Sequence, residues 1–261
     1  MFVDGVELTD KDLAGLSQEG LADLAKAMAA WRVKESQSQF FRMFPAEDTK
    51  QSDGSMIYAR SKYAKHLEFF GAGADYRERC AMCANRVGKT YGMGAYETTC
   101  HLTGLYPDWW PGYRFTKPIR AWAAGKTNET TRDIVQTVLL GSISFDGARK
   151  TTTGTGMVPG YLLANPSWKQ GVQDLVDNVQ VQHISGGWST LGLKSYQQGR
   201  GSFEGTSQDW VWLDEEPPIE VYGEVVIRTA TTNGRVAMTF TPLEGLSDTV
   251  MQFIAKDETA I

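Results

Sequence analysis

The chain has 261 residues, of which 41% are hydrophobic and 22% charged, and this is typical of a globular protein with one large domain or two small ones. No window of about 18 uncharged apolar residues occurs, so a membrane-spanning helix is excluded. The formal net charge of −5 has the wrong sign for a protein that coats nucleic acid, so any contact with DNA must be local or shared across an oligomer.

Residues 8–35 carry the periodicity of an amphipathic helix. The apolar positions of this pattern are Leu13, Leu16, Leu21, Leu24, Ala25, Met28 and Trp31. The helix is either an arm packed on the rest of the protein, which we favour, or an arm that binds a partner. We assign residues 1–55 to a helical arm and linker, and residues 56–261 to the main domain. A further helix is expected at about 57–70, ended by the glycines that follow it.

Residues 79–90 contain the most informative motif. A short apolar strand runs into a tight loop that ends in Gly88-Lys89-Thr90, and residues 91–99 suit the start of a helix. This strand–loop–helix order is typical of a loop that binds nucleotide phosphates. Lys89 would reach the β- and γ-phosphates, and the Thr90 hydroxyl would bind Mg²⁺. The β-phosphate would be surrounded by backbone N–H groups of Cys83, Ala84, Asn85, Arg86, Val87 and Gly88.

The motif is imperfect, because Cys83 stands where the general pattern has its first glycine. A plain helix N-terminus after a glycine turn is therefore an alternative for this segment alone. Cys80 and Cys83 form a C-x2-C pair without the second pair that a zinc site needs, so we interpret them as small core residues. An aromatic or glutamine side chain upstream of the loop is expected to bind the adenine ring, but the sequence does not identify it.

The middle of the chain predicts a further β–α unit. Residues 105–113 form an aromatic loop that either packs on the core, which we favour, or stacks on bases. A strand at 119–125 precedes a helix at 129–140, which Thr127 or Asn128 would cap. A strand followed by a helix in this way is typical of a parallel sheet.

Residues 142–175 allow no firm prediction, whereas the next segments do. Strands at 179–184 and 189–195 flank two glycines and predict a hairpin. Arg200 follows between two glycines, where its side chain is expected to be exposed. We interpret three groups of basic residues as solvated surface. These groups are Arg60/Lys62/Lys65, Arg114/Lys117/Arg120 and Lys194/Arg200.

Residues 210–218 form an apolar run that ends abruptly in three acids and two prolines. A buried parallel strand has this pattern, with its carboxyl end at a ligand crevice. Asp214 at that end could share a Mg²⁺ ion with Thr90, and Glu215 could deprotonate the attacking water. An acidic turn after an ordinary core strand is the alternative. Because this segment and the Gly-Lys-Thr loop occur in the right order, about 125 residues apart, we predict a P-loop domain that hydrolyses ATP.

The C-terminal part completes the predicted fold. A helix is expected at 219–229, a turn at Asn233-Gly234, and a strand at 236–242 that lies beside the phosphate-loop strand. We therefore expect an α/β domain of the P-loop, RecA-like class, with a central and mostly parallel sheet flanked by helices and an N-terminal helical arm.

These landmarks resemble the N-terminal ATPase domain of the terminase large subunits of tailed bacteriophages, the motors that package DNA into preformed capsids. The resemblance covers roughly residues 37–250 and rests on four segments. They are the degenerate phosphate loop 83–90, the acidic strand 211–218, Arg200-Gly201 with Phe203-Glu204-Gly205, and Thr239-Phe240-Thr241-Pro242. The missing first glycine is usual in this family, and the last segment looks like its Thr-x-Thr-Pro coupling motif.

The resemblance implies a role for each matching residue. Lys89 and Thr90 would bind phosphates and metal, Asp214 would bind the metal, and Glu215 would activate water. ATP and Mg²⁺ are the expected ligands.

Thr239 and Thr241 would sense the γ-phosphate and pass hydrolysis on to a DNA-gripping subdomain. The family also needs an arginine for the charge that develops on the γ-phosphoryl group. Arg86 is the candidate within the subunit, and Arg200 is the candidate supplied by a neighbouring subunit. Some relatives carry the loop arginine one place earlier, at the position of Asn85.

The implied partners are double-stranded DNA, other copies of the chain in a ring on the portal of the procapsid, and a small terminase subunit. The implied place of action is the host cytoplasm, with no membrane partner. The family also has a C-terminal nuclease domain of the ribonuclease H type. Since nothing in this sequence matches that domain, we expect the chain to be an N-terminal fragment.

Two other functions are also compatible with the sequence. One is a helicase-like DNA translocase fragment, which is also a P-loop enzyme. The other is an assembly module in which bound nucleotide controls docking with little hydrolysis.

Overall fold

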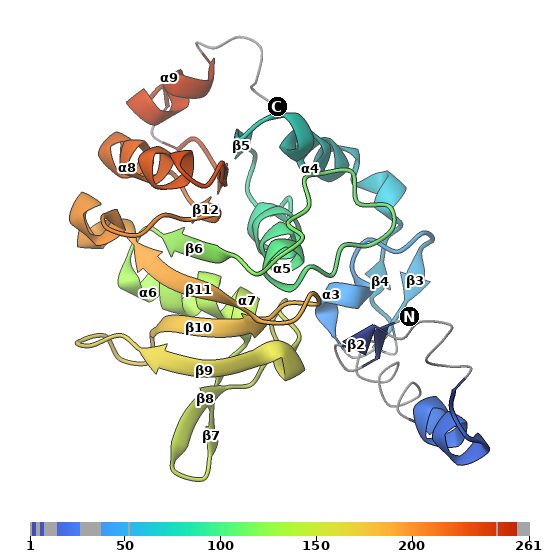
Figure 1. Ribbon diagram of the computed structural model, residues 1–261. Helices are drawn as coiled ribbons and strands as arrows, with labels where there is room; N and C mark the ends of the chain where they lie inside the picture. Colours follow the sequence, from blue (N-terminus) through green and yellow to red (C-terminus); the bar gives the residue numbers. More distant parts are fainter. Residues whose placement is uncertain are drawn as a thin grey trace.

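The computed structural model describes residues 2–3, 6–7, 15–26, 38–51, 53–243 and 245–254. A seven-stranded sheet with the order β5-β13-β12-β6-β11-β10-β9 forms the centre of the structure (Figure 1). In chain order the strands are β5 (Glu78–Met82), β6 (Arg120–Gly125), β9 (Leu163–Trp168), β10 (Val176–Gln182), β11 (Trp188–Ser195), β12 (Trp210–Asp214) and β13 (Arg235–Phe240). The strands from β5 to β11 in this order are parallel, and β10 and β9 extend the sheet as antiparallel neighbours.

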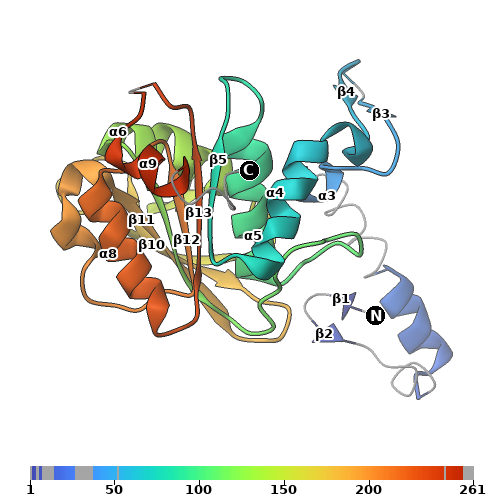
Figure 2. The same cartoon turned by 90° about the horizontal axis from the view of Figure 1, so that it is seen from above.

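Helices cover both faces of the sheet (Figure 2). One face carries α4 (Ala64–Asp75), the π-helical η2 (Lys89–Ala95), α5 (Tyr96–Thr103), α6 (Asn128–Thr130), η3 (Thr131–Gln136) and α7 (Thr137–Leu140). The other face carries α8 (Ile219–Ala230) and α9 (Asp248–Ile254). Each face has its own cluster of buried side chains, and every residue of β12 is buried. The predicted α/β architecture with a mostly parallel sheet flanked by helices is therefore confirmed.

Shorter elements complete the described chain. They are β1 (Phe2–Val3), β2 (Val6–Glu7), α3 (Gln39–Arg42), β3 (Thr49–Lys50), β4 (Met56–Ile57), η1 (Arg60–Lys62), β7 (Ile143–Asp146), β8 (Arg149–Thr152), η4 (Gly160–Leu162), η5 (Tyr196–Gln198) and η6 (Arg200–Phe203). Phe40 in α3 and Phe44 just after it lie in the core cluster of the α4–α5 face. The segment 142–175, whose sequence allows no firm prediction, contains the β7–β8 hairpin and the edge strand β9.

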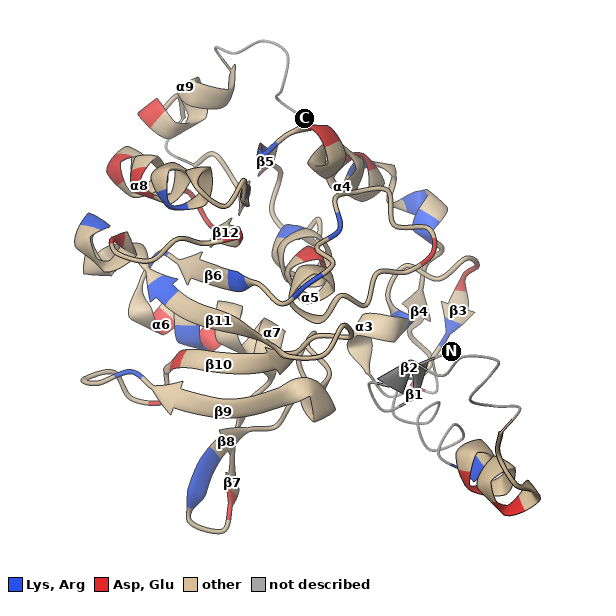
Figure 3. Ribbon diagram, in the orientation of Figure 1, with Lys and Arg blue, Asp and Glu red and all other residues tan. Residues whose placement is uncertain are grey.

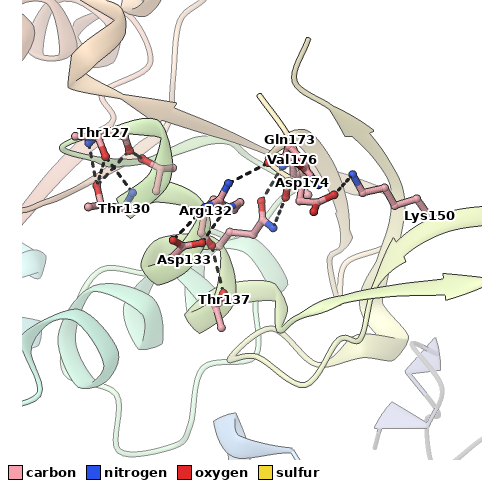
Figure 4. Close-up of polar contacts among 11 residues, drawn as sticks. Thr127, Thr130, Arg132, Asp133, Thr137, Lys150, Gln173, Asp174 and Val176 are labelled. Carbon is pink, nitrogen blue, oxygen red and sulfur yellow. Dashed lines mark hydrogen bonds and ion pairs between the residues drawn. The ribbon is translucent and has the colours of Figure 1, made fainter. Parts of the chain in front are cut away.

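The predicted β–α unit and hairpin are both present. Thr127 caps the helix that begins at Asn128, and the Thr127 and Thr130 side chains bond reciprocally to each other's backbone N–H (Figure 4). The other end of this helical segment is tied to β10, because the Gln136 amide bonds to the Asp174 carbonyl and to the backbone N–H of the residue that opens the strand. Lys150 of β8 forms an ion pair with Asp174, so the β7–β8 hairpin is fixed at the same point (Figure 4).

The predicted helix at 57–70 is wrong in its bounds. Residue Ile57 belongs to β4, and α4 begins at Ala64 and continues through both glycines to Asp75. The glycines do not break the helix because at least one of them serves tertiary packing. A Cβ atom at Gly73 would lie 2.8 Å from the guanidinium carbon of Arg79, which is buried. Glycine is therefore required there by a close approach and not by a turn.

Two further expectations concern aromatic and apolar side chains. The aromatic loop packs on the core, since Trp110 is 5% exposed and its ring centroid lies 4.7 Å from that of Phe70.

Of the predicted N-terminal helix, residues 15–26 are described, whereas 8–14 and 27–35 lie outside the described residues. Leu16 and Leu21 are exposed, so packing of the arm is not seen for these two side chains. Among the described helices, none has both the length and the apolar character needed to cross a membrane.

Basic residues are spread over several elements of the described chain, and acidic residues lie among them (Figure 3). Of the three basic groups, most members are exposed, as predicted for solvated surface. The exposed members are Lys62, Lys65, Arg114, Lys117, Arg120 and Arg200. Arg60 and Lys194 are half-buried instead, because their cationic groups lie over the rings of Trp109 and Trp122.

Candidate active site

The phosphate-loop motif lies between β5 and η2 at the carboxyl end of the parallel strands. The chain leaves β5 while the N–H of Cys83 still bonds to the carbonyl of Phe240 in β13, at 3.0 Å. It then turns into η2 at Gly88, whose φ of 84° is in the left-handed region. Only glycine adopts this conformation without steric penalty, which accounts for the residue before Lys89. The sequence order of strand, loop and helix is therefore confirmed.

A cluster of hydroxyls surrounds the carboxylate at the end of β12. The hydroxyls of Thr90 and Thr239 both donate to Oδ1 of Asp214, at 3.0 Å and 2.9 Å. The two threonines come from different elements, Thr90 from η2 and Thr239 from β13. The motif residues at 90, 214 and 239 thus meet at one carboxylate, as expected for the ends of parallel strands.

The direction of the Thr239 hydrogen bond is fixed by a buried tryptophan. The Nε1–H of Trp212 donates to Oγ1 of Thr239 at 2.8 Å. An indole N–H can only donate, so the threonine oxygen accepts this bond and its proton points to Asp214. Trp212 itself is fully buried against η2, where a Cβ atom at Gly94 would lie 2.1 Å from its ring. β12, η2 and Thr239 of β13 are therefore interlocked around Asp214.

Burial raises the pKa of Asp214 to about 7, although the hydroxyls of Thr90 and Thr239 stabilise the carboxylate. A bound cation would stabilise the charged form of a carboxylate whose burial raises its pKa. The oxygen atoms of Asp214 and Thr90 are ligands that suit Mg²⁺. No group of three or more His, Cys, Asp or Glu residues in the described ranges could hold a metal. Asp214 and Thr90 offer two oxygen ligands, which suits an ion that takes its remaining ligands from phosphate and water, as Mg²⁺ commonly does.

Replacing Asp214 with asparagine should remove a pH dependence of stability from the nucleotide-free protein. The folded state holds a proton on Asp214 up to about pH 7, whereas the unfolded chain releases it near 3.8, so wild-type stability falls as the pH rises between these values. From about pH 5.5 to about pH 8 the wild type should lose about 2 kcal/mol relative to Asp214→Asn. Urea unfolding of both proteins measures this difference, and parallel pH profiles would contradict it.

Lys89 and Glu215 face each other beside this cluster. The Nζ of Lys89 lies 3.9 Å from Oε1 of Glu215, with the lysine side chain 9% exposed and that of the glutamate 40% exposed. Glu215 has a φ of 62°, and its N–H bonds to the carbonyl of Thr239 at 3.0 Å. The left-handed backbone conformation of Glu215, directly after β12, thus turns its carboxylate out of the sheet toward Lys89 and solvent.

The second threonine of the segment 239–242 contacts the phosphate loop directly. The hydroxyl of Thr241 donates to Oδ1 of Asn85 at 3.0 Å. The first threonine contacts Asp214, so the segment 239–241 links the loop to the acidic strand. These are the two positions that the sequence singled out, and their roles in coupling remain predictions.

The two candidate arginines are not part of this group. Arg86 is exposed at the tip of the loop with a φ of 63°, and among the described residues it makes no hydrogen bond or ion pair. Arg200 in η6 lies 3.0 Å from Glu224 of α8 and 3.5 Å from Glu204, with 57% of its side chain exposed. The prediction that Arg200 is exposed is correct. Its ion-pair partners are Glu204 and Glu224, and neither of them belongs to the group formed by Lys89 and Glu215.

A small apolar cavity of about 210 Å³ opens beside the phosphate loop. Its walls include Ile57, Tyr63, His66, Val87 and Tyr91. Burial lowers the pKa of His66, so the ring is neutral at pH 7 and compatible with an apolar wall. The cavity is formed largely by the upstream segments that the sequence suggested for the adenine ring.

The structure adds functional candidates that the sequence did not identify. Trp212 lies inside the acidic strand, but only the fold brings its indole to Thr239. Tyr196, the first residue of η5, donates its hydroxyl proton to the carbonyls of Asp214 and Glu215, and no motif marks it. The cavity residues come from three separate segments, so no spacing pattern could have grouped them.

Comparisons with known proteins point to one family. The model of the family described as terminase large subunit, T4likevirus-type, N-terminal, matches residues 80–261. The chain is 35% identical over 239 residues to the terminase large subunit of Salmonella phage P22, a match that covers 84% of this chain and 46% of that protein. It thus spans about half the length of that relative. A solved structure of the large terminase of a thermophilic bacteriophage in complex with ADP is 12% identical, covers 69% of this chain and 38% of its own, and has a TM-score of 0.41. Because the family model matches most of the chain, the protein belongs to the family of terminase large subunits, in their N-terminal part.

Proposed function

We propose that the protein is the ATPase motor domain of a terminase that packages viral DNA, hydrolysing ATP to move double-stranded DNA into a procapsid. The observation that carries this proposal is the convergence of Lys89, Thr90, Asp214 and Glu215 at one edge of the sheet. Membership of the terminase large subunits supports the link from this site to DNA packaging.

The residues would divide the chemistry between them. The loop N–H groups and Lys89 would bind the phosphates, and Thr90 and Asp214 would hold Mg²⁺, which would supply positive charge to the phosphate oxygens. Glu215 accepts a proton from the attacking water, because its carboxylate is partly exposed, lies beside Lys89 and is turned out of the sheet. Thr239 and Thr241 connect this centre to the rest of the domain through Asp214 and Asn85.

The cavity beside the loop is our candidate for the adenine ring. It is next to Gly88, so a base in it would be connected to phosphates on the loop. The rings of Tyr63 and Tyr91 and the side chain of Ile57 offer apolar surface for a planar base. Recognition of this kind would rest on shape and stacking, with the neutral His66 as the polar group of the wall.

Filling that cavity should weaken the binding of ATP but not of inorganic triphosphate. In Ile57→Trp the larger side chain would occupy the space of the base, whereas the loop and Lys89 would be unchanged. We expect the Kd for ATP to rise about 10-fold or more, while the Kd for triphosphate stays within about twofold. Titration calorimetry measures both values. Ile134→Trp is the control, because Ile134 is 44% exposed and outside the cavity. An equal loss for ATP and triphosphate would place the base elsewhere.

The arginine that stabilises the γ-phosphoryl charge would come either from Arg86 in the same loop or from Arg200 of a neighbouring subunit. Arg86 is next to the phosphates but exposed at the tip of its loop. Arg200 is exposed on the surface, as a residue offered to another subunit must be, and its ion pair with Glu224 fixes its direction.

We propose three partners for the protein in the cytoplasm of the host cell. They are other subunits in a ring on the procapsid portal, a small terminase subunit and double-stranded DNA.

Steady-state phosphate release from ATP tests the proposed function. Wild-type protein should turn over ATP with Mg²⁺, double-stranded DNA should stimulate turnover, and Lys89→Ala should abolish it because the phosphates lose their cation. Stimulation by single strands together with strand separation would favour the helicase-like alternative. Tight ATP binding without turnover in the wild type would favour the assembly module.

A further inference from the structure

Tyr196 is a buried tyrosine whose hydroxyl bonds to the backbone of Asp214 and Glu215, here called the acidic pair. It lies in η5, directly after β11, and is 6% exposed. The hydroxyl lies 2.9 Å from the carbonyl oxygen of Asp214 and 3.1 Å from that of Glu215. A hydroxyl between two acceptors donates its one proton to both in a shared hydrogen bond.

The Tyr196 hydroxyl acts as a hydrogen-bond donor to β12 at the point where the pairing of β12 with β6 ends. The pairing of β12 with β6 ends at Leu213 and Ala124, one residue before Asp214. On the other side the ladder continues, since the N–H of Glu215 bonds to the carbonyl of Thr239. Tyr196 therefore supplies the hydrogen-bond donor for the carbonyls of Asp214 and Glu215, which lie beyond the end of the pairing with β6. Buried carbonyls require such a partner.

Glu215 depends on this support because its backbone is in the left-handed region. A φ of 62° is unfavourable for a residue with a Cβ, and such a conformation persists only where its surroundings impose it. The bond from its N–H to Thr239 fixes one side of the peptide, and the Tyr196 hydroxyl fixes the carbonyls before and after the turn. The orientation of the side chain follows from this conformation.

We propose that Tyr196 is a positioning residue for hydrolysis, which holds Glu215 in the conformation that directs its carboxylate at the attacking water. The inference rests on the proposed function, in which Glu215 is the base. Tyr196 contacts the backbone and not the carboxylate, so it acts through Glu215.

The chain offers a matched control in Tyr222. This tyrosine in α8 is also 6% exposed and packs in the same buried cluster, and its hydroxyl bonds to the Glu78 side chain at the start of β5. Since β5 and β12 are aligned in parallel with β13, Glu78 lies at the opposite edge of the sheet from Asp214. Removing either hydroxyl deletes the same group from the same core, but only Tyr196 lies near the acidic pair.

The test compares Tyr196→Phe with Tyr222→Phe in steady-state ATP hydrolysis. We expect kcat to fall about 10- to 100-fold in Tyr196→Phe with the KM for ATP within about twofold, because binding is intact and the base is misplaced. Tyr222→Phe should keep kcat within about twofold, although both variants lose a buried hydrogen bond and unfold at lower urea concentrations. A crystal structure of Tyr196→Phe should show Glu215 with a changed φ.

Equal kcat values in the two variants would overturn the positioning role, as would a crystal structure of Tyr196→Phe in which Glu215 is unchanged. Wild-type protein and Glu215→Gln are measured alongside. If these two proteins have the same turnover, Glu215 is not the base and the proposed mechanism fails together with the inference. If they differ and Tyr196→Phe equals Tyr222→Phe, only the inference fails.

Discussion

Replacing Glu215 with glutamine should reduce ATP turnover about 10²- to 10⁴-fold while ATP still binds. Glutamine has the same shape as glutamate but cannot accept the proton of the attacking water. The phosphate-binding groups are untouched, since Lys89 is buried and fixed in η2, and Thr90 bonds to Asp214 and not to Glu215. Removing the negative charge beside Lys89 should leave the Kd for ATP unchanged or lower. Single-turnover hydrolysis and equilibrium binding of ATP separate the two effects.

The neighbouring acid is the control for this experiment. Glu216 directly follows Glu215, but its carboxylate accepts a hydrogen bond from Ser247, whereas the carboxylate beside Lys89 is that of Glu215. Glu216→Gln should therefore keep turnover within about threefold of the wild type. A normal rate in Glu215→Gln, or an equal loss in both variants, would show that the proton acceptor is another group.

Adding a single methyl group at Gly94 should strongly destabilise the fold. A Cβ atom there would lie 2.1 Å from Cε2 and 2.2 Å from Nε1 of Trp212, whose ring is fully buried. The ring cannot move away without breaking its bond to Thr239, and η2 cannot move without displacing Lys89. Overpacking of this kind should cost about 3 kcal/mol or more in the free energy of unfolding of Gly94→Ala, measured by urea denaturation.

Gly223→Ala is the matched control for this change. Gly223 is also in a helix, in α8, but no atom lies within 4 Å of the position that a Cβ would take. Alanine there should stabilise the protein by about 0.5–1 kcal/mol, because the unfolded chain loses conformational freedom. Similar free energies of unfolding for the two variants would contradict the close packing of η2 on Trp212.

The sequence predicts those parts of the fold whose signals are local. The β10–β11 hairpin and the Thr127 cap depend on residues a few positions apart, and both are confirmed. The prediction of a helix at 57–70 is wrong in its bounds, and its C-terminal bound is wrong because glycine has two uses that a sequence does not distinguish. At Gly73 the missing side chain makes room for Arg79, a contact between two elements, and the helix runs on.

The centre of the site is predictable for a different reason. Parallel strands bring their carboxyl ends to one edge, so the order of the motifs is enough to predict that Thr90, Asp214 and Thr239 meet. The supporting residues cannot be predicted in this way. Tyr196 reaches Asp214 and Glu215, and the indole of Trp212 reaches Thr239, only through the pairing of β11, β6, β12 and β13, which no single segment encodes.

A crystal structure of the protein with Mg²⁺ and the complex of ADP with aluminium fluoride tests the central claim most directly. We expect Mg²⁺ bound by the Thr90 hydroxyl and the Asp214 carboxylate, with Lys89 on the phosphate oxygens and the fluoride facing Glu215 across one water position. The adenine ring should lie against Tyr63 or Tyr91. A nucleotide bound away from the loop, or Asp214 still closed onto Thr90 and Thr239 without a metal ion, would contradict the assignment of this site to ATP hydrolysis.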